Sequence, residues 1–173
     1  MRIISRIDIK NEFVIKGINL EGLRKIGDPL KIASEYYKDG IDEIMMMDAV
    51  ASLYGRNNLF NIVERSVENI FVPITLGGGI RSLKDIDKAL KSGADKVAIN
   101  SYATENPNFI KEAVKNFGSS TIVVYIEAKN VGEGKWEAYK NSGRDKTGLE
   151  IVNWVQRVQD YNCGEILITS IDY

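Results

Sequence analysis

Two acidic side chains, Asp8 and Glu127, stand at matching positions in similar stretches of sequence. Asp8 lies in Arg6-Ile-Asp-Ile-Lys-Asn11, and Glu127 lies in Tyr125-Ile-Glu-Ala-Lys-Asn130. A pair of carboxylates can act as general acid and general base when their surroundings give them different proton affinities. Each could instead be a solvated acid at the end of a strand, but the internal echo favours a functional pair.

Three glycines at 77–79 follow a β-branched run and precede a predicted helix. Glycine lets backbone N–H groups approach a phosphate closely, and the N-terminus of a helix adds positive partial charge. A tight turn is the other common use of such a triplet. Because Asn100 and Ser101 add donors at the next predicted strand end, we expect Gly78 and Gly79 to take part in a phosphate site.

Further charged residues have two interpretations each. Lys16 lies in an alternating segment after the first strand and could hold a second anion, or it could be an exposed hairpin lysine. Four other charged residues begin predicted strands, on the face opposite the proposed site, and form either a solvated rim or a ring at the bottom of a barrel: Arg2, Glu43, Lys96 and Glu165.

These residues must be positioned by strands and helices that alternate along the chain. Short β-branched runs separated by longer amphipathic stretches predict parallel strands joined by crossover helices. Strands are expected near Ile3–Ile9, Glu43–Asp48, Val72–Leu76, Lys96–Asn100, Thr121–Glu127 and Glu165–Ser170. Helices are expected near Pro29–Lys38, Leu59–Glu68, Leu83–Ser92, Pro107–Phe117 and Gly148–Tyr161.

The expected helix starts carry capping signals. Asp28 and Asn106 each precede a proline, and Thr147 with Glu150 matches a capping box. The methionine run 45–47 is assigned to the core of its strand. In a parallel barrel the C-terminal ends of the strands carry the site, so polar residues at those ends are expected to converge on one face.

Composition limits the chemistry. The chain has 23 basic and 24 acidic side chains, which gives no electrostatic reason to expect a nucleic acid or an anionic membrane as partner. Histidine is absent and Cys163 is the single cysteine, which excludes histidine-based proton transfer and ordinary zinc sites. With no secretory or membrane-spanning pattern, we expect a cytoplasmic protein that needs no metal or other cofactor.

Several motifs across the chain match one known family in order and spacing. They include Val14-Ile-Lys-Gly17, Gly27-Asp-Pro29, Leu76-Gly-Gly-Gly-Ile80, Gly93-Ala-Asp-Lys-Val97 and Gly164-Glu-Ile-Leu-Ile-Thr-Ser-Ile-Asp172. In these motifs the chain resembles the cyclase subunit of imidazole glycerol phosphate synthase (the HisF family). The resemblance implies an α/β protein with a TIM (β/α)8 barrel, here a single domain over residues 1–173 truncated to about six βα units and lacking the last two.

The resemblance also implies a reaction and a partner. Ammonia from a glutaminase subunit (HisH) would convert phosphoribulosyl-formimino-AICAR phosphate, a phosphorylated small molecule, to imidazole glycerol phosphate and AICAR phosphate. Asp8 and Glu127 match the two catalytic acids, and Lys16 matches a loop lysine. Further family positions are the phosphate site (Gly79, Asn100, Ser101), the pocket (Asp48, Ser142, Gly143, Thr169), the ammonia gate (Arg2, Glu43, Lys96, Glu165) and the glutaminase-facing Asp95.

The chain departs from the family pattern at three places. Glu127 stands where the family has an aspartate, Ser5-Arg6 stands where it usually has Pro-Cys, and the βα units that carry the second phosphate site are absent. Because a displacement of about 1 Å can cost on the order of 100-fold in rate, the chain is expected to be a poor catalyst. The alternatives are a HisF-like subunit that passes ammonia toward amidino-sugar synthesis, or a non-catalytic scaffold for the glutaminase.

Overall fold

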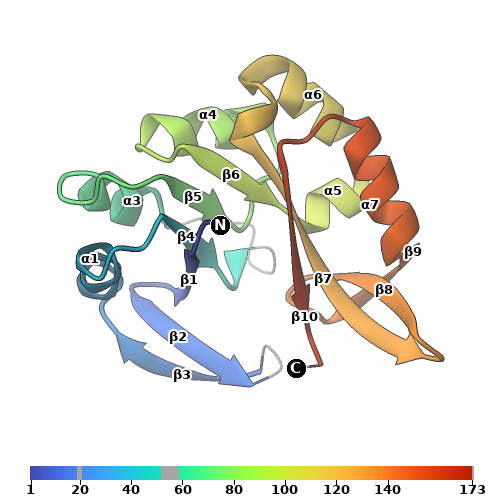
Figure 1. The fold of residues 1–173 in the computed structure, drawn as a ribbon, viewed down its shortest axis with the longest axis horizontal. Helices are drawn as coiled ribbons and strands as arrows, with labels where there is room; N and C mark the ends of the chain where they lie inside the picture. The colour runs from blue at the N-terminus through green and yellow to red at the C-terminus, as the bar shows by residue number, and fades with distance from the viewer. Residues whose placement is uncertain (19–20, 52–58, 173) are drawn as a thin grey trace. The chain divides into compact units, whose positions relative to one another are not determined.

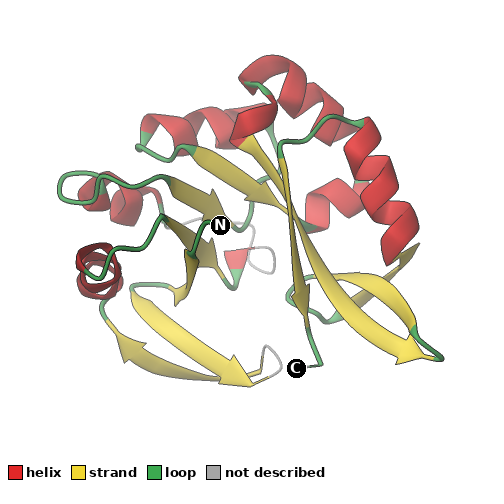
Figure 2. Cartoon of the chain, viewed as in Figure 1, coloured by secondary structure: helices red, strands yellow, loops and turns green. Residues whose placement is uncertain are grey.

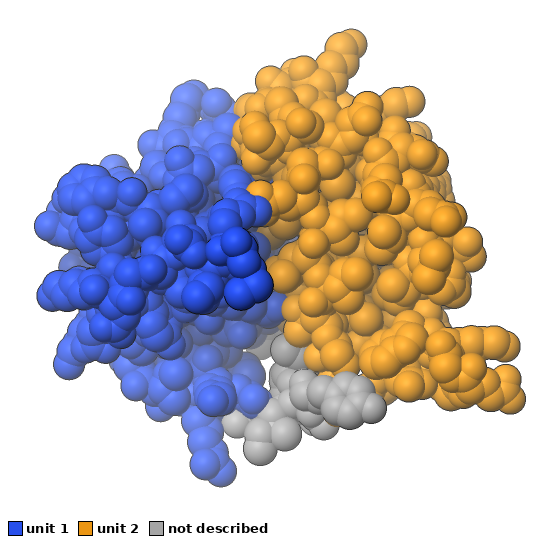
Figure 3. Space-filling model, in the orientation of Figure 1, with its two compact units in different colours: residues 1–97 blue, residues 98–173 orange. Residues whose placement is uncertain are grey.

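The computed structural model describes residues 1–18, 21–51 and 59–172 of the chain. The chain divides into two compact units, residues 1–97 and residues 98–173 (Figure 3). Tyr173, after which the sequence ends, lies outside the described residues. No helix within the described ranges is both long and apolar enough to cross a membrane.

Unit 1 is built on two parallel and two antiparallel strand pairs. It contains β1 (Ile4–Lys10), β2 (Phe13–Ile18), β3 (Glu21–Gly27), β4 (Glu43–Asp48) and β5 (Ile74–Gly77), in the order β3-β2-β1-β4-β5. The β1–β4 and β4–β5 pairs are parallel, whereas β1–β2 and β2–β3 form antiparallel hairpins. The helices are α1 (Pro29–Lys38), α3 (Phe60–Ser66) and α4 (Leu83–Lys91). Figure 1 and Figure 2 show how these helices alternate with the strands.

The chain passes from unit 1 to unit 2 within β6 (Lys96–Ile99). Unit 2 contains helices α5 (Ser101–Glu105), α6 (Asn108–Phe117) and α7 (Ile151–Asp160), and a 3-10 turn at Ser119–Thr121. Its strands are β7 (Ile122–Gly132), β8 (Lys135–Lys140), β9 (Asp145–Glu150) and β10 (Glu165–Ser170). β10 pairs with β7 in parallel, and β8 and β9 continue from β7 as antiparallel hairpins (Figure 1).

Each unit contains a parallel strand pair with the same register. In unit 1, Glu43 lies beside Ile4 and Met47 lies beside Asp8. In unit 2, Glu165 lies beside Val123 and Thr169 lies beside Glu127. In each parallel pair the earlier strand, β1 or β7, also continues into an antiparallel hairpin, with β2 or β8. The sequence echo is therefore also a structural repeat.

The faces of β1 differ in polarity. Ile7 and Ile9 are buried on one face, while Arg6 and Asp8 lie partly exposed on the other, because successive side chains of a strand alternate between faces. All six residues of β4 are buried, including the methionine run 45–47. The assignment of these methionines to the core is confirmed.

The predicted helix cap at Asp28 is confirmed, and α4 has a further side-chain cap. The carboxylate of Asp28 accepts a hydrogen bond of 2.9 Å from the amide of Lys31, and Pro29 opens α1. Before α4, Ser82 and Asp85 form a reciprocal capping box. These bonds satisfy backbone N–H groups that a helix start leaves without a partner.

The other two predicted caps are wrong. Asn106 ends α5, so it closes one helix and does not open the next, and α6 begins at Asn108 with no side-chain capping bond in the described structure. Thr147 belongs to β9, where its hydroxyl donates to the carbonyl of Ala138. Helix α7 therefore begins at Ile151, later than predicted, and Glu150 alone caps it.

The cap at Glu150 uses its own carboxylate. The side chain accepts hydrogen bonds from the amides of Asn153 at 2.9 Å and Val152 at 3.0 Å. These bonds, the one from Asn153 first, hold the pKa of Glu150 below its ordinary value of 4.5 because they favour the ionised form.

Candidate functional site

The carboxylate of Asp8 is held by Arg6, two residues earlier on the same face of β1. Nε and Nη2 of Arg6 each lie 2.9 Å from Oδ1 of Asp8. The side chains of Arg6 and Asp8 are 25% and 33% exposed. A guanidinium that approaches a carboxylate through two nitrogens fixes the orientation of the carboxylate and also balances its negative charge. Asp8 thus lies near the C-terminal end of β1 as an oriented, accessible carboxylate.

Glu127 occupies the corresponding position on β7 and is only 4% exposed. Its Oε2 accepts a hydrogen bond of 2.9 Å from the amide of Gly143. Ser142 and Gly143 connect β8 to β9 with positive φ angles of 60° and 74°, a conformation in which glycine is not strained. The structure therefore brings together three predicted residues, Glu127, Gly143 and, through the strand register, Thr169.

The glycine triplet lies directly against the end of β4. A Cβ on Gly78, whose φ is +99°, would lie 2.5 Å from the backbone oxygen of Asp48. Gly79 also has a positive φ, of 71°. The carboxylate of Asp48 is buried and accepts a hydrogen bond of 3.0 Å from the amide of Val50. Only glycine fits at position 78, so the turn and Asp48 form one compact group within unit 1.

Asn100 and Ser101 lie at the start of α5 in unit 2. The hydroxyl oxygen of Ser101 accepts a hydrogen bond of 3.0 Å from the amide of Asn141, which joins α5 to the turn between β8 and β9. Oδ1 of Asn100 is buried and has no hydrogen-bond partner among the described residues. The predicted phosphate residues therefore fall into a group in each unit, and their joint use stays a prediction.

Glu43 is the centre of a buried cluster at the start of β4, the strand end opposite that of Asp8. It is 1% exposed, and its Oε2 lies 3.2 Å from Nη1 of Arg2 and 2.9 Å from Nζ of Lys96. Its Oε1 accepts a hydrogen bond of 2.7 Å from Thr75. Glu165 begins β10 at the corresponding place in unit 2. Three of the four predicted gate residues thus meet within unit 1.

Sequence reasoning did not single out Thr75. The signal that could have found it is the strand register. Thr75 on β5 lies beside Met45 on β4, and Met45 is on the same face of β4 as Glu43, two residues earlier. A threonine on an apolar face needs a hydrogen-bond acceptor for its hydroxyl, and the buried carboxylate supplies it.

Two other predicted residues have local roles. Lys16 is exposed on β2 of the β2–β3 hairpin. The carboxylate of Asp95 accepts a hydrogen bond of 2.8 Å from the amide of Ile74, at the start of β5. A loop role for Lys16 and a partner-facing role for Asp95 stay predictions.

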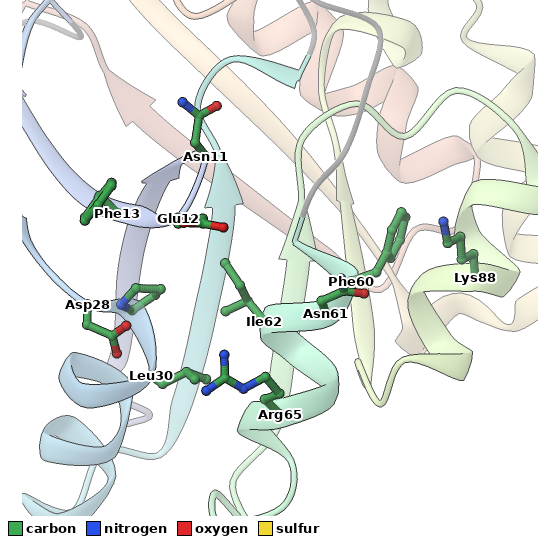
Figure 4. Close-up of a pocket in the computed structure, with 11 residues that line it drawn as sticks. Asn11, Glu12, Phe13, Asp28, Leu30, Phe60, Asn61, Ile62, Arg65 and Lys88 are labelled. Carbon is green, nitrogen blue, oxygen red and sulfur yellow. The ribbon is translucent and has the colours of Figure 1, made fainter.

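A pocket of about 1080 Å³ lies in unit 1, between the turn that joins β1 to β2 and the N-terminal ends of α1 and α3 (Figure 4). Its charged side chains balance, with two acids and two bases, and it contains none of the predicted site residues. It is lined by Asn11, Glu12, Phe13, Asp28, Pro29, Leu30, Phe60, Asn61, Ile62, Arg65 and Lys88. Among the described residues, no three His, Cys, Asp or Glu side chains are grouped to hold a metal ion.

Comparison with known proteins identifies the family. The model of the family described as histidine biosynthesis protein matches residues 2–173. The chain is 51% identical over 172 residues to the imidazole glycerol phosphate synthase subunit HisF of Legionella pneumophila. This match covers 99% of the chain and 81% of that relative. The chain is 46% identical over 171 residues to HisF of Bacillus cereus (strain Q1), covering 99% and 68%. The chain belongs to the histidine biosynthesis protein family.

Membership in this family confirms the predicted fold class, since the family is a TIM barrel and both units contain parallel strands joined by helices. Both relatives are HisF subunits, so the chain is a HisF-type lyase subunit of histidine biosynthesis, as the resemblance predicted. The matches do not favour the amidino-sugar alternative or the scaffold alternative.

Proposed function

We propose that this chain uses ammonia from a glutaminase subunit to convert phosphoribulosyl-formimino-AICAR phosphate to imidazole glycerol phosphate and AICAR phosphate. The observation that carries the proposal is the position of the two carboxylates. Asp8 on β1 and Glu127 on β7 hold the same register position in the two repeated strand pairs. A pair of acids repeated in this way suits a reaction that needs one proton acceptor and one proton donor.

The two acids differ in their surroundings. Asp8 is partly exposed and held by a guanidinium, whereas Glu127 is buried and accepts a hydrogen bond from a backbone amide. Addition of ammonia requires a base to remove a proton from the attacking nitrogen, and departure of the amine product requires an acid. Two carboxylates in unlike environments can divide these roles between them.

Ammonia would enter at the Glu43 cluster. Glu43 lies beside Ile4, and Asp8 is four residues after Ile4 on the same face of β1. At roughly 3.3 Å per residue, the distance along β1 from Ile4 to Asp8 is about 13 Å. A glutaminase bound at the N-terminal ends of the strands would release ammonia at this cluster. We assign Arg2, Glu43 and Lys96 to the entrance, and the Asp8 end of the strands to the reaction.

The phosphorylated substrate would be held at the glycine turn. Gly78 and Gly79 both have positive φ, so the turn can present backbone N–H groups to a phosphate. The resemblance assigns Asn100 and Ser101, at the start of α5 in unit 2, to phosphate binding as well. We expect these steps to take place in the cytoplasm.

The test is turnover of the bisphosphate substrate with an ammonium salt, and then with glutamine and a HisH-type glutaminase. We expect the wild-type chain to form imidazole glycerol phosphate under both conditions. Asp8→Asn and Glu127→Gln keep the shape of each side chain but remove the proton transfer, so each should lower kcat by about 10² to 10⁴. Asp87→Asn, at an exposed acid that pairs with Lys91, is the matched control. Full activity of Asp8→Asn, or no turnover by the wild type, would contradict the proposal.

A further inference from the structure

We propose that Arg6 is a positioning residue that holds one oxygen of Asp8 and so directs the other oxygen to the substrate. This inference rests on the proposed function, because it gives Arg6 a role through Asp8. Nothing in the reaction itself requires an arginine at this position, and the HisF resemblance predicts a cysteine there.

The geometry of the pair is asymmetric. Both Nε and Nη2 of Arg6 approach the same oxygen, Oδ1 of Asp8, at 2.9 Å. Oδ2 receives no hydrogen bond from any described residue. A carboxylate held at one oxygen by two charged donors cannot rotate freely about χ2, so its other oxygen keeps a constant direction.

The strand supplies the arrangement. Arg6 and Asp8 are two residues apart, so they lie on the same face of β1, and the long arginine side chain runs along that face to the shorter aspartate. On the opposite face, Ile7 and Ile9 are completely buried and hold the backbone of β1 in place. The guanidinium therefore acts on Asp8 from a rigid support.

The second repeat holds its acid in another way. Tyr125 corresponds to Arg6, since it precedes Glu127 by two residues on β7 and lies beside Leu167, as Arg6 lies beside Met45. Glu127 is held by the backbone amide of Gly143. A guanidinium two residues before the acid is thus a feature of the first repeat and not a general requirement of the strand.

Orientation of a reacting group has a large effect on rate. A displacement of about 1 Å can cost on the order of 100-fold, because the group leaves the near-attack geometry. Arg6→Ala should therefore lower kcat by about 10- to 100-fold and leave the KM for the bisphosphate within about threefold. Arg6→Lys keeps the charge but can offer only one ammonium group, so its kcat should fall between those of Arg6→Ala and the wild type.

The experiment measures kcat and KM of these variants with an ammonium salt and the bisphosphate substrate, together with their circular dichroism. Arg65→Ala, which removes an exposed arginine from α3, is the control and should behave as wild type. Added guanidinium ions at millimolar concentration should restore part of the activity of Arg6→Ala. In an Asp8→Asn background, removing Arg6 should cause no further loss, because the arginine acts through the carboxylate.

The outcomes separate this inference from the proposed function. An active wild type with an unchanged kcat in Arg6→Ala would overturn the positioning role alone. A raised KM with an unchanged kcat would also overturn it, because Arg6 would then bind substrate directly. If Arg6→Ala does not fold, Arg6→Lys decides the question, and wild-type kinetics in that folded variant would overturn the role. An inactive wild type would contradict the proposed function itself.

Discussion

Replacing Glu127 by the aspartate that the HisF resemblance predicts at this position tests whether the site is built for the longer acid. Glu127→Asp withdraws the carboxylate by one C–C bond, about 1.5 Å. The bond from the Gly143 amide to Oε2, now 2.9 Å, would lengthen beyond hydrogen-bonding distance. A hydrogen bond to a charged group contributes about 1.5–3 kcal/mol, and for a chain of this size each kcal/mol corresponds to roughly 2–4 °C in Tm.

We therefore expect Glu127→Asp to lower Tm by about 3–12 °C and kcat by on the order of 100-fold, because both the Gly143 bond and the position of the acid are lost. Tm would be measured by circular dichroism and kcat with an ammonium salt. Glu127→Gln is the matched control, since it keeps the length and an oxygen acceptor for Gly143, so it should retain Tm while losing activity. A Glu127→Asp variant that is faster than wild type would refute the reasoning and show that the glutamate is a defect of the site.

Three further substitutions test local features. Gly78→Ala should lower the free energy of unfolding, measured by urea denaturation, by more than about 2 kcal/mol, because its Cβ meets the backbone of β4. Gly118→Ala, also at positive φ but in open space, should lower it by less. Glu43→Ala should lower the free energy of unfolding by about 3–5 kcal/mol, since it removes the buried carboxylate on which Arg2, Lys96 and Thr75 converge. The pKa of Glu150 is lowered on folding, so its ionised carboxylate stabilises the folded protein at pH values above 4.5. Glu150→Gln should therefore lower Tm at pH 7, and the difference in Tm from wild type should shrink as the pH falls below 4.5.

The sequence predicted the parallel strands well and the polar hairpins poorly. Glu43–Asp48 and Glu165–Ser170 have the predicted bounds because each is a short apolar run between turn signals. β8 and β9 were not predicted, since they are polar and partly exposed and their pairing depends on a turn at residues with positive φ. The alternating segment after the first strand was correctly recognised as a possible hairpin.

The candidate site was predictable only where a residue type and a repeat coincided. Asp8 and Glu127 follow from the echo, and the register confirms their equivalence. The contact of Arg6 with Asp8 depends on side-chain rotamers, and that of Gly143 with Glu127 depends on a turn 16 residues away in sequence, so neither follows from spacing. The predicted cap at Thr147 is wrong because the same residue pattern also suits a strand. Thr147 lies in β9, which pairs with β8.

The methionine run on β4 has a consequence for the proposed ammonia route. Met45 and Met47 lie on the same face as Glu43 and beside Arg6 and Asp8, between the two ends of the route. Methionine is unbranched, with three rotatable bonds, so these side chains can change rotamer to let a small molecule pass while the strand stays in place. The thioether sulfurs of these methionines also make this layer sensitive to oxidants: a sulfoxide oxygen there would introduce a polar group into the proposed route, and we expect peroxide to impair ammonia transfer while the strands remain paired.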